Sequence, residues 1–253
     1  ALDHPGIARV FDVGETDDGG AYLVMELVRG KTLREHMREG SLDRAARLAL
    51  VCEIADALDH AHRAGVIHRD VKPENVMVRE DGRACLLDFG LAKGLDVATA
   101  DTIDSDTPAH TAEHLTKEGA LVGTLSYLAP EQARGRDVGP RSDQFALATT
   151  AYELLAGQLP WDGPNAAAVL AQILVDDAPP PSSVERSLPP AADAVLARAL
   201  AKRPDDRYES AGEFARALTA SFDAPVARPR APGGGAPWVP WAAGGAVVLA
   251  IAL

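Results

Sequence analysis

Residues 68–75 bring three polar side chains of different chemistry onto one short stretch of chain. Asp70 is a carboxylate, Lys72 an ammonium group and Asn75 a carboxamide. A long helical pattern precedes this stretch and an apolar run at residues 76–78 follows it, so we expect a polar loop between a helix and a strand. Such a loop can present Asp70 to a hydroxyl, Lys72 to a phosphate and Asn75 to a divalent ion.

A second polar motif, Asp-Phe-Gly at residues 88–90, follows this loop. The apolar residues 84–87 predict a strand, and the Asp-Gly pair at 81–82 predicts a turn before it. A strand, a turn and a second strand return the chain to its starting point, which would place Asp88 beside Asn75. Two oxygen ligands would then converge where a hard ion that bridges phosphates could sit.

Together the two stretches resemble motifs of the eukaryotic-like protein kinases. The string H-R-D-x-K-P-E-N at residues 68–75 resembles their catalytic loop, and residues 88–90 resemble their metal-binding tripeptide. The resemblance implies an α+β, protein-kinase-like bilobal fold with a mostly helical large lobe and a β small lobe, here truncated. It also implies a serine/threonine protein kinase that uses ATP and Mg²⁺ to phosphorylate Ser or Thr hydroxyls of proteins.

The same resemblance implies a role for each residue of the two motifs. Asp70 accepts or orients the substrate hydroxyl, and Lys72 neutralises charge on the transferring phosphoryl group. Asn75 and Asp88 hold magnesium. Structural or regulatory roles are expected for His68, Arg69, Phe89 and Gly90.

Further matches to the family lie beyond the loop. Glu131 ends an Ala-Pro-Glu triplet and is expected to pair with Arg207. Asp143 is expected to hold the backbone of the catalytic loop; the alternative is an ordinary carboxylate near a helix N-terminus. Thr124 matches the threonine that bonds the catalytic aspartate in serine/threonine kinases.

Strand-like runs at residues 10–14 and 21–25, with Asp-Asp-Gly-Gly between them, predict a β-hairpin. By the resemblance, the hinge that binds adenine follows: Glu26 offers a carbonyl and Val28 an amide, and Met25 is the gatekeeper. Met77 would form an apolar floor under the adenine. The alternatives are an ordinary strand exit after residue 25 and a plain core residue at position 77.

Helical spacing of apolar residues predicts the large lobe. A short helix is expected at residues 32–39, followed by a long one that Ser41 caps and that Gly65 ends in a left-handed conformation. The next helix begins near residue 141, is ended by Gly157, and is apolar on most sides. Further helices are expected at residues 166–174, 191–201 and 210–221.

Residues 91–122 are polar and irregular and resemble an activation segment. Arg69 directly precedes Asp70, a pattern of kinases that are switched by phosphorylation of this segment, because a phosphate there can pair with an arginine and order the loop. Thr116 is the expected acceptor, and autophosphorylation the expected source.

The net charge of the chain narrows the possible partners. A formal net charge of -12 argues against nucleic acid as a general partner.

The chain has two cysteines, Cys52 and Cys85, and both lie in apolar stretches. They are expected to be buried, reduced thiols.

Both ends of the chain predict a fragment of a longer protein. No Gly-rich phosphate loop and no strand lysine precede the expected hinge. We expect a small-lobe remnant and hinge at 1–28, the large lobe at 29–222, a Pro/Gly-rich juxtamembrane linker at 223–237 and the start of a transmembrane helix at 238–253. Arg228 and Arg230 favour a single-pass protein of the cell membrane with a cytoplasmic kinase domain. A buried core helix is the alternative for 238–253, and a homodimer is left open.

Two other classes of function compete with the kinase. A pseudokinase would keep the fold as a binding module without catalysis, and an isolated fragment that lacks half of the nucleotide site would be inert. A metal site at His60, His62 and His68 is disfavoured, because acidic or thiol partners at ligand spacing are absent from the sequence around them.

Overall fold

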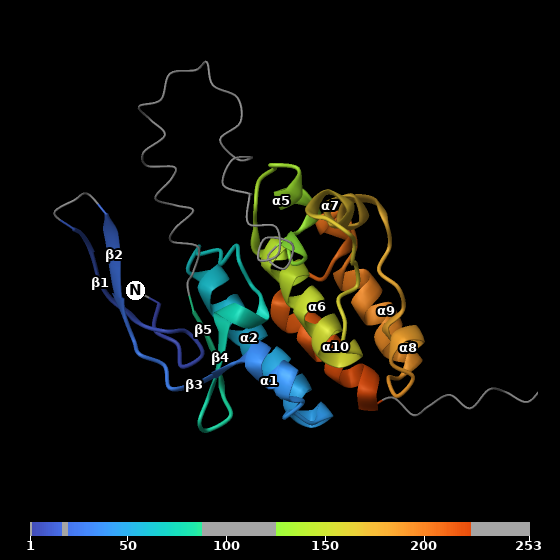
Figure 1. The fold of residues 1–253 in the computed structure, drawn as a ribbon, viewed down its shortest axis with the longest axis horizontal. Helices are drawn as coiled ribbons and strands as arrows, with labels where there is room; N and C mark the ends of the chain where they lie inside the picture. Colours follow the sequence, from blue (N-terminus) through green and yellow to red (C-terminus); the bar gives the residue numbers. More distant parts are fainter. Residues whose placement is uncertain (1, 17–19, 88–124, 224–253) are drawn as a thin grey trace, which may run out of the picture.

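The structure, a computed structural model, describes residues 2–16, 20–87 and 125–223 (Figure 1). A β-hairpin stands at one end, a three-stranded sheet adjoins it, and helices fill the rest of the described part. The chain therefore has a small β portion, built mainly from its N-terminal residues, and a larger helical portion. This arrangement is the α+β fold expected from the sequence.

The hairpin joins β1 (Val10–Glu15) to β2 (Ala21–Met25) in antiparallel pairing. Val13 lies opposite Leu23, and the register is irregular between Val10 and Asp12. Both predicted strands are confirmed. Residues 17–19, where the turn is predicted, lie outside the described residues.

The second sheet has the order β3-β4-β5, formed by Gly30–Thr32, Val76–Arg79 and Ala84–Leu86, with all neighbours antiparallel. β4 and β5 confirm the strands predicted on either side of the turn, whereas β3 was not predicted. Gly30 adopts a φ of 144°, and a Cβ there would lie 2.1 Å from the Val78 carbonyl oxygen, so the close pairing of β3 with β4 requires glycine. This pairing anchors the chain after β2 beside the strand that follows residues 68–75.

Local capping decides where the first helices begin. Thr32 caps α1 (Leu33–Glu39) in a capping box: its hydroxyl accepts from the Glu35 amide, and the Glu35 carboxylate accepts from the Thr32 amide. The long helix α2 (Arg44–Arg63) is capped by Asp43, whose Oδ1 accepts from the Ala46 amide at 2.8 Å. The prediction of Ser41 as this cap was wrong, because the Ser41 hydroxyl bonds the ring of His36 at 2.7 Å instead.

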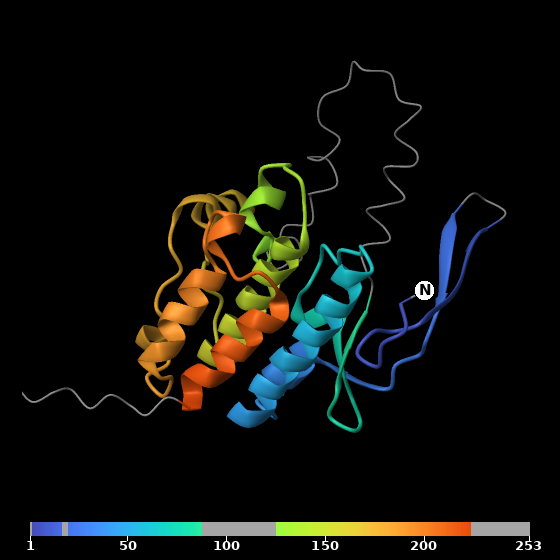
Figure 2. The same ribbon diagram turned by 180° about the vertical axis from the view of Figure 1, so that it is seen from behind.

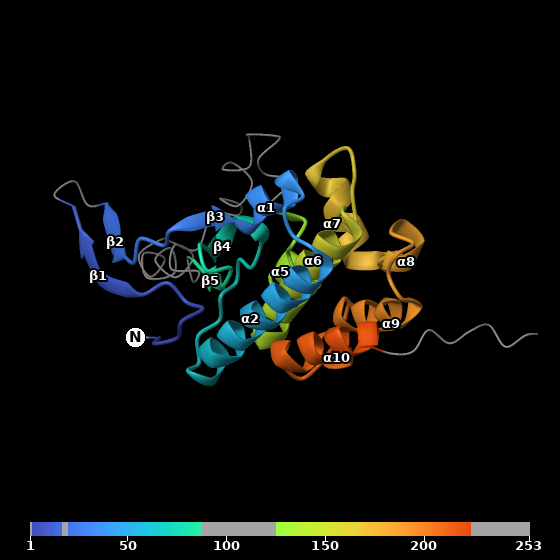
Figure 3. The ribbon, with the colours of Figure 1, turned by 90° about the horizontal axis from the view of Figure 1, so that it is seen from below.

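The helical portion is centred on α6 (Pro140–Ala156), in which every residue from 142 to 155 is buried. α2 and α10 (Ala211–Asp223) pack against each other and both contact α6, as the views from behind and from below show (Figures 2 and 3). Gly65 and Gly157 have φ values of 76° and 79° and follow α2 and α6, as predicted. The remaining helices are η1 (Pro73–Asn75), α5 (Pro130–Ala133), α7 (Ala166–Val175), α8 (Pro181–Val184), α9 (Pro190–Ala199) and η4 (Pro204–Asp206).

The two cysteines differ in burial. Cys85 is buried as predicted, and burial raises the pKa of its thiol. Cys52 is only partly buried, with its sulfur 3.3 Å from the Thr219 hydroxyl, so the prediction of a buried thiol was wrong there. None of the helices that the structure describes is long and apolar enough to cross a bilayer.

Candidate active site

The predicted catalytic residues of the loop converge on one carboxylate. Lys72 Nζ donates to Asp70 Oδ2 at 2.8 Å, and Asn75 Nδ2 donates to the same oxygen at 2.9 Å and to the Asp70 carbonyl at 2.8 Å. The Asp70 side chain remains 29% exposed. Because the Asn75 nitrogen is used in these bonds, its Oδ1 is the atom suited to a hard cation. The loop thus offers a carboxylate held by a cation, with an amide oxygen beside it.

His68 joins this loop to Leu87, the residue that follows strand β5. Its Nε2 donates to the Leu87 carbonyl at 2.9 Å, and its Nδ1 accepts from the Asp70 amide at 3.3 Å. Burial lowers the pKa of His68, which favours the neutral ring that this donor and acceptor pattern requires. The Leu87 amide in turn donates to the Asn75 carbonyl at 2.9 Å. Leu87 is therefore fixed against both ends of the loop.

Asp143 on α6 holds the backbone of the loop. Its Oδ1 accepts from the Arg69 amide at 2.7 Å, and its Oδ2 accepts from the His68 amide at 2.8 Å. His62 Nε2, at the end of α2, lies 2.7 Å from Oδ2, and the Asp143 side chain is 1% exposed. This confirms the predicted role of Asp143, whereas the contribution of His62 was missed.

The loop contains one unusual backbone conformation. Arg69 has a φ of 69°, and it is the one residue other than glycine with positive φ in the described ranges 2–16, 20–87 and 125–223. Its amide is held by Asp143 and its carbonyl accepts from Gln132 Nε2 at 3.0 Å. Both sides of the strained residue are thus fixed by other segments, as such a conformation requires.

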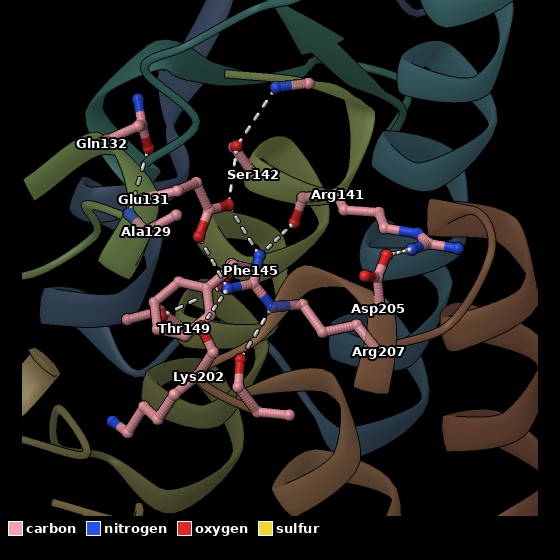
Figure 4. Close-up of polar contacts among 12 residues, drawn as sticks. Ala129, Glu131, Gln132, Arg141, Ser142, Phe145, Thr149, Lys202, Asp205 and Arg207 are labelled. Atoms are coloured by element: carbon pink, nitrogen blue, oxygen red, sulfur yellow. Dashed lines mark hydrogen bonds and ion pairs between the residues drawn. The ribbon is translucent and has the colours of Figure 1, made fainter. Parts of the chain in front are cut away.

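Glu131 and Arg207 form the predicted ion pair, which is buried (Figure 4). Arg207 Nη1 and Nη2 each donate to a different Glu131 oxygen at 2.8 Å, and Ser142 Oγ adds a bond at 2.7 Å. The guanidinium also lies 4.8 Å from the centre of the Phe145 ring. Although burial acts to raise it, these bonds hold the pKa of Glu131 below its ordinary value. The pair fastens α5 to the chain before α10.

Arg34 on α1 forms a second charged group that the sequence did not indicate. Its Nε donates to Glu74 Oε1 at 2.7 Å, and its Nη1 donates to Glu153 Oε1 at 2.6 Å. Its Nη2 also donates to the Tyr127 hydroxyl, which itself donates to Glu153. In the sequence, the position of Glu74 directly before Asn75 is the only hint of a role in the site. No local pattern indicates that Arg34, 40 positions earlier, is the partner of Glu74.

The expected hinge borders a small apolar cluster that is separate from the main core. Glu26 pairs through its carboxylate with Arg79 at 2.8 Å, and the hydrogen bond from Arg79 lowers the pKa of Glu26. In the part of the chain that the structure describes, the Glu26 carbonyl and the Val28 amide form no main-chain hydrogen bond. The cluster consists of buried Ala8, Val28 and Cys85 with partly buried Met25, Met77 and Leu87. Met77 therefore lies in the same apolar group as Val28, as the predicted adenine floor would.

Comparison with known proteins agrees with this geometry. The model of the protein kinase domain family matches residues 1–219. The chain belongs to this family. The kinase domain is 40% identical over 225 residues to a probable serine/threonine-protein kinase of Corynebacterium efficiens, covering 86% of this chain and 32% of that protein. It is 38% identical over 218 residues to the serine/threonine-protein kinase PknB of Mycolicibacterium smegmatis and to that of Mycobacterium tuberculosis, covering 85% of this chain and 33% of each relative. The chain thus spans about a third of the length of these curated relatives.

Several predicted residues of the kinase domain lie outside the described residues. They are Asp88, Phe89, Gly90, Thr116 and Thr124. The convergence of Asp88 on Asn75 stays a prediction. The described chain stops one residue short of Asp88, at Leu87, whose amide is bonded to Asn75.

The histidines have partners other than a metal. His62 bonds Asp143 and His68 bonds the Leu87 carbonyl, while the His60 ring lies 5.0 Å from that of His4. Among residues 2–16, 20–87 and 125–223, no cluster of three or more histidine, cysteine or acidic side chains could hold a metal ion.

Proposed function

We propose that the protein transfers the γ-phosphoryl group of ATP to serine or threonine hydroxyls of other proteins. The observation that carries this proposal is the Asp70 carboxylate held by both Lys72 and Asn75 on a loop whose backbone is anchored by Asp143. A loop that served only to connect two elements would not need a partly exposed carboxylate held by two of its own side chains on a backbone anchored from α6. The similarity to serine/threonine-protein kinases supports serine/threonine specificity.

The roles of the side chains follow from the charge changes of the reaction. The hydroxyl oxygen forms a bond to the γ-phosphorus while the bond from that phosphorus to the bridging oxygen of ADP breaks. Asp70 orients the hydroxyl and accepts its proton, and Lys72 offsets negative charge on the transferring group. The contribution of the loop is mainly to position these groups before the reaction begins.

The described residues fit the nucleotide and its metal ion. The expected hinge offers the Glu26 carbonyl and the Val28 amide, and Val28 belongs to the same apolar cluster as Met77. The Asn75 Oδ1 is an oxygen ligand of the kind that magnesium prefers, and Asp88 would supply a second one. Bound magnesium would neutralise negative charge on the phosphates.

An Asp70→Asn variant of the full-length protein tests the assignment. Loss of a positioned acid-base group should lower kcat by about 10²-fold or more, or roughly 3 kcal/mol of barrier. Asp81→Asn, at an exposed turn of the same domain, is the matched control. Undiminished phosphate transfer by Asp70→Asn would refute the assignment. A wild-type protein that binds ATP and transfers no phosphate would instead identify a pseudokinase.

Regulation by phosphorylation of residues 91–122 is part of the proposal. The Arg69 side chain is exposed beside Asp70, and within the described residues it has no acidic partner. It could therefore receive a phosphate on Thr116. Mass spectrometry of the active protein should find phosphate at Thr116, and Thr116→Ala should lower its activity. Full activity without modification at this residue would contradict the proposal.

We also propose that residues 238–253 begin a transmembrane helix that leaves the kinase domain in the cytoplasm. The support is their apolar sequence and the arginines at 228 and 230 before them. Full-length protein should stay with the membrane fraction after alkaline carbonate washing. A variant that ends at residue 223 should be released, and equal release of both would contradict the proposal.

A further inference from the structure

Arg34 joins three segments that are distant in sequence. Glu74 belongs to η1 of the catalytic loop, Glu153 to α6, and Tyr127 to the segment that leads into α5. The Arg34 side chain is 18% exposed and that of Glu153 is 11% exposed, while that of Glu74 is 47% exposed. The contact of the guanidinium with Glu153 is therefore the more buried one, and its contact with Glu74 of the loop lies closer to solvent.

Glu74 connects this contact to the reacting carboxylate. It directly precedes Asn75, and Asn75 is the residue that donates to Asp70 Oδ2. Movement of η1 would therefore move the group that orients Asp70. On the other side of the loop, Gln132 of α5 donates to the Arg69 carbonyl. The loop is consequently tied to the segment around residues 127–132 at both of its ends.

The positive charge of Arg34 is needed to hold Glu74 and Glu153 close to each other. Burial alone would lower the pKa of Arg34, but the hydrogen bond to Glu153 raises it, so the cation is retained. Burial and the neighbouring Glu153 raise the pKa of Tyr127, so that its phenol stays neutral and can donate. Without Arg34, the carboxylates of Glu74 and Glu153 would face the same space without a counter-ion. Glu74, the more exposed of the two, would turn toward solvent.

We propose that Arg34 is a positioning residue for phosphoryl transfer, which holds η1 and, through Asn75, the orientation of the Asp70 carboxylate. The inference rests on the proposed function, because it assigns a part of the same site. It predicts an effect on kcat rather than on the KM for ATP, since the side-chain partners of Arg34 in the described part of the chain are Glu74, Tyr127 and Glu153, none of which belongs to the hinge or the apolar cluster.

The test compares Arg34→Met with Arg38→Met in the full-length protein. Arg38 is exposed on the same helix and forms no ion pair among the described residues. Arg34→Met should lower kcat by about tenfold or more per folded molecule, with the KM for ATP changed by less than threefold. Arg38→Met should stay within twofold of wild type. Arg34→Met within twofold of Arg38→Met, or a lowered melting temperature with unchanged kcat per folded molecule, would overturn the proposal.

A second variant keeps the test informative if Arg34→Met does not fold. Glu74→Gln removes the charge from the outer contact and leaves at most a neutral hydrogen bond there, while Arg34 stays paired with Glu153, and it should lower kcat by several fold. When both single variants fold, the double variant should be no slower than Arg34→Met alone, because the two changes break one connection. Unchanged kcat in Glu74→Gln, or losses that multiply in the double variant, would contradict the inference. An inactive wild-type protein would instead count against the proposed function itself.

Discussion

Replacing Asp143 by Asn should destabilise the domain far more than its small change in shape suggests. The carboxylate accepts three hydrogen bonds: one from the Arg69 amide at Oδ1, and two from the His68 amide and the His62 ring at Oδ2. Asparagine has one acceptor oxygen and one donating NH₂ group. Whichever way it turns, at least one buried N–H group of the loop loses its acceptor and faces another donor.

The size of the loss follows from these contacts. A hydrogen bond to a charged group contributes about 1.5–3 kcal/mol, and a buried donor left without a partner costs about 1–3 kcal/mol. Since the remaining oxygen keeps part of the interaction, we expect Asp143→Asn to lower the free energy of unfolding by about 2–4 kcal/mol. The Arg69 backbone would then relax from its left-handed conformation. The kcat per folded molecule should therefore fall as well.

Urea unfolding and steady-state kinetics on the same preparations measure both effects. Asp137→Asn is the matched control, because Asp137 lies in the exposed segment just before α6 and should change stability by less than about 0.5 kcal/mol. If Asp143→Asn were as stable and as active as this control, the loop would be held by its own short-range bonds, and the anchoring role assigned to Asp143 would be wrong.

Three other outcomes follow from contacts elsewhere in the domain. Glu131→Gln should lower the free energy of unfolding by about 2–4 kcal/mol, because it leaves the buried Arg207 without its carboxylate, and adding Arg207→Met should restore part of this loss in urea titrations. Gly212→Ala should cost about 1–3 kcal/mol, because a Cβ there would lie 2.5 Å from Asp59 Oδ2; thermal unfolding should show a smaller cost in an Asp59→Ala background. Burial lowers the pKa of Lys202 to about 8, while the unfolded chain keeps a value of about 10.4. Between these values the unfolded chain binds more protons, so stability should rise with pH by about 1–2 kcal/mol, allowing for partial exposure, and Lys202→Met should lose this rise.

The elements that depend on local sequence patterns were predicted correctly from the sequence. The hairpin, the long α2 and the end of α6 at Gly157 each follow from the spacing of apolar residues or from a residue that tolerates positive φ. Motif resemblance added contacts across long distances, since Asp143 and the pair of Glu131 with Arg207 were expected from the family and are found in the structure.

The predictions that failed depended on tertiary contacts. Ser41 and Asp43 are both able to cap α2, and the choice falls on Asp43 because His36, on the preceding helix, bonds the Ser41 hydroxyl. Strand β3 has only three residues and no alternating pattern, and it exists because Gly30 allows the Val78 carbonyl to approach. Arg34 looks like any exposed helical arginine until its three partners are brought together by the fold.

The catalytic loop buries Val71 and Pro73, but burial of these two side chains cannot set the directions of its polar groups. Its order comes instead from hydrogen bonds to residues far along the chain: Asp143 lies 74 positions from Arg69, Gln132 lies 63 positions from it, and Arg34 lies 40 positions from Glu74. These partners lie on α6, α5 and α1, so the loop can make all three bonds only when each of these helices is in its folded position. Because the bonds share a short segment of backbone, their losses should be coupled rather than additive. The position of Asp70 is therefore a property of the packed helices as much as of the motif that contains it.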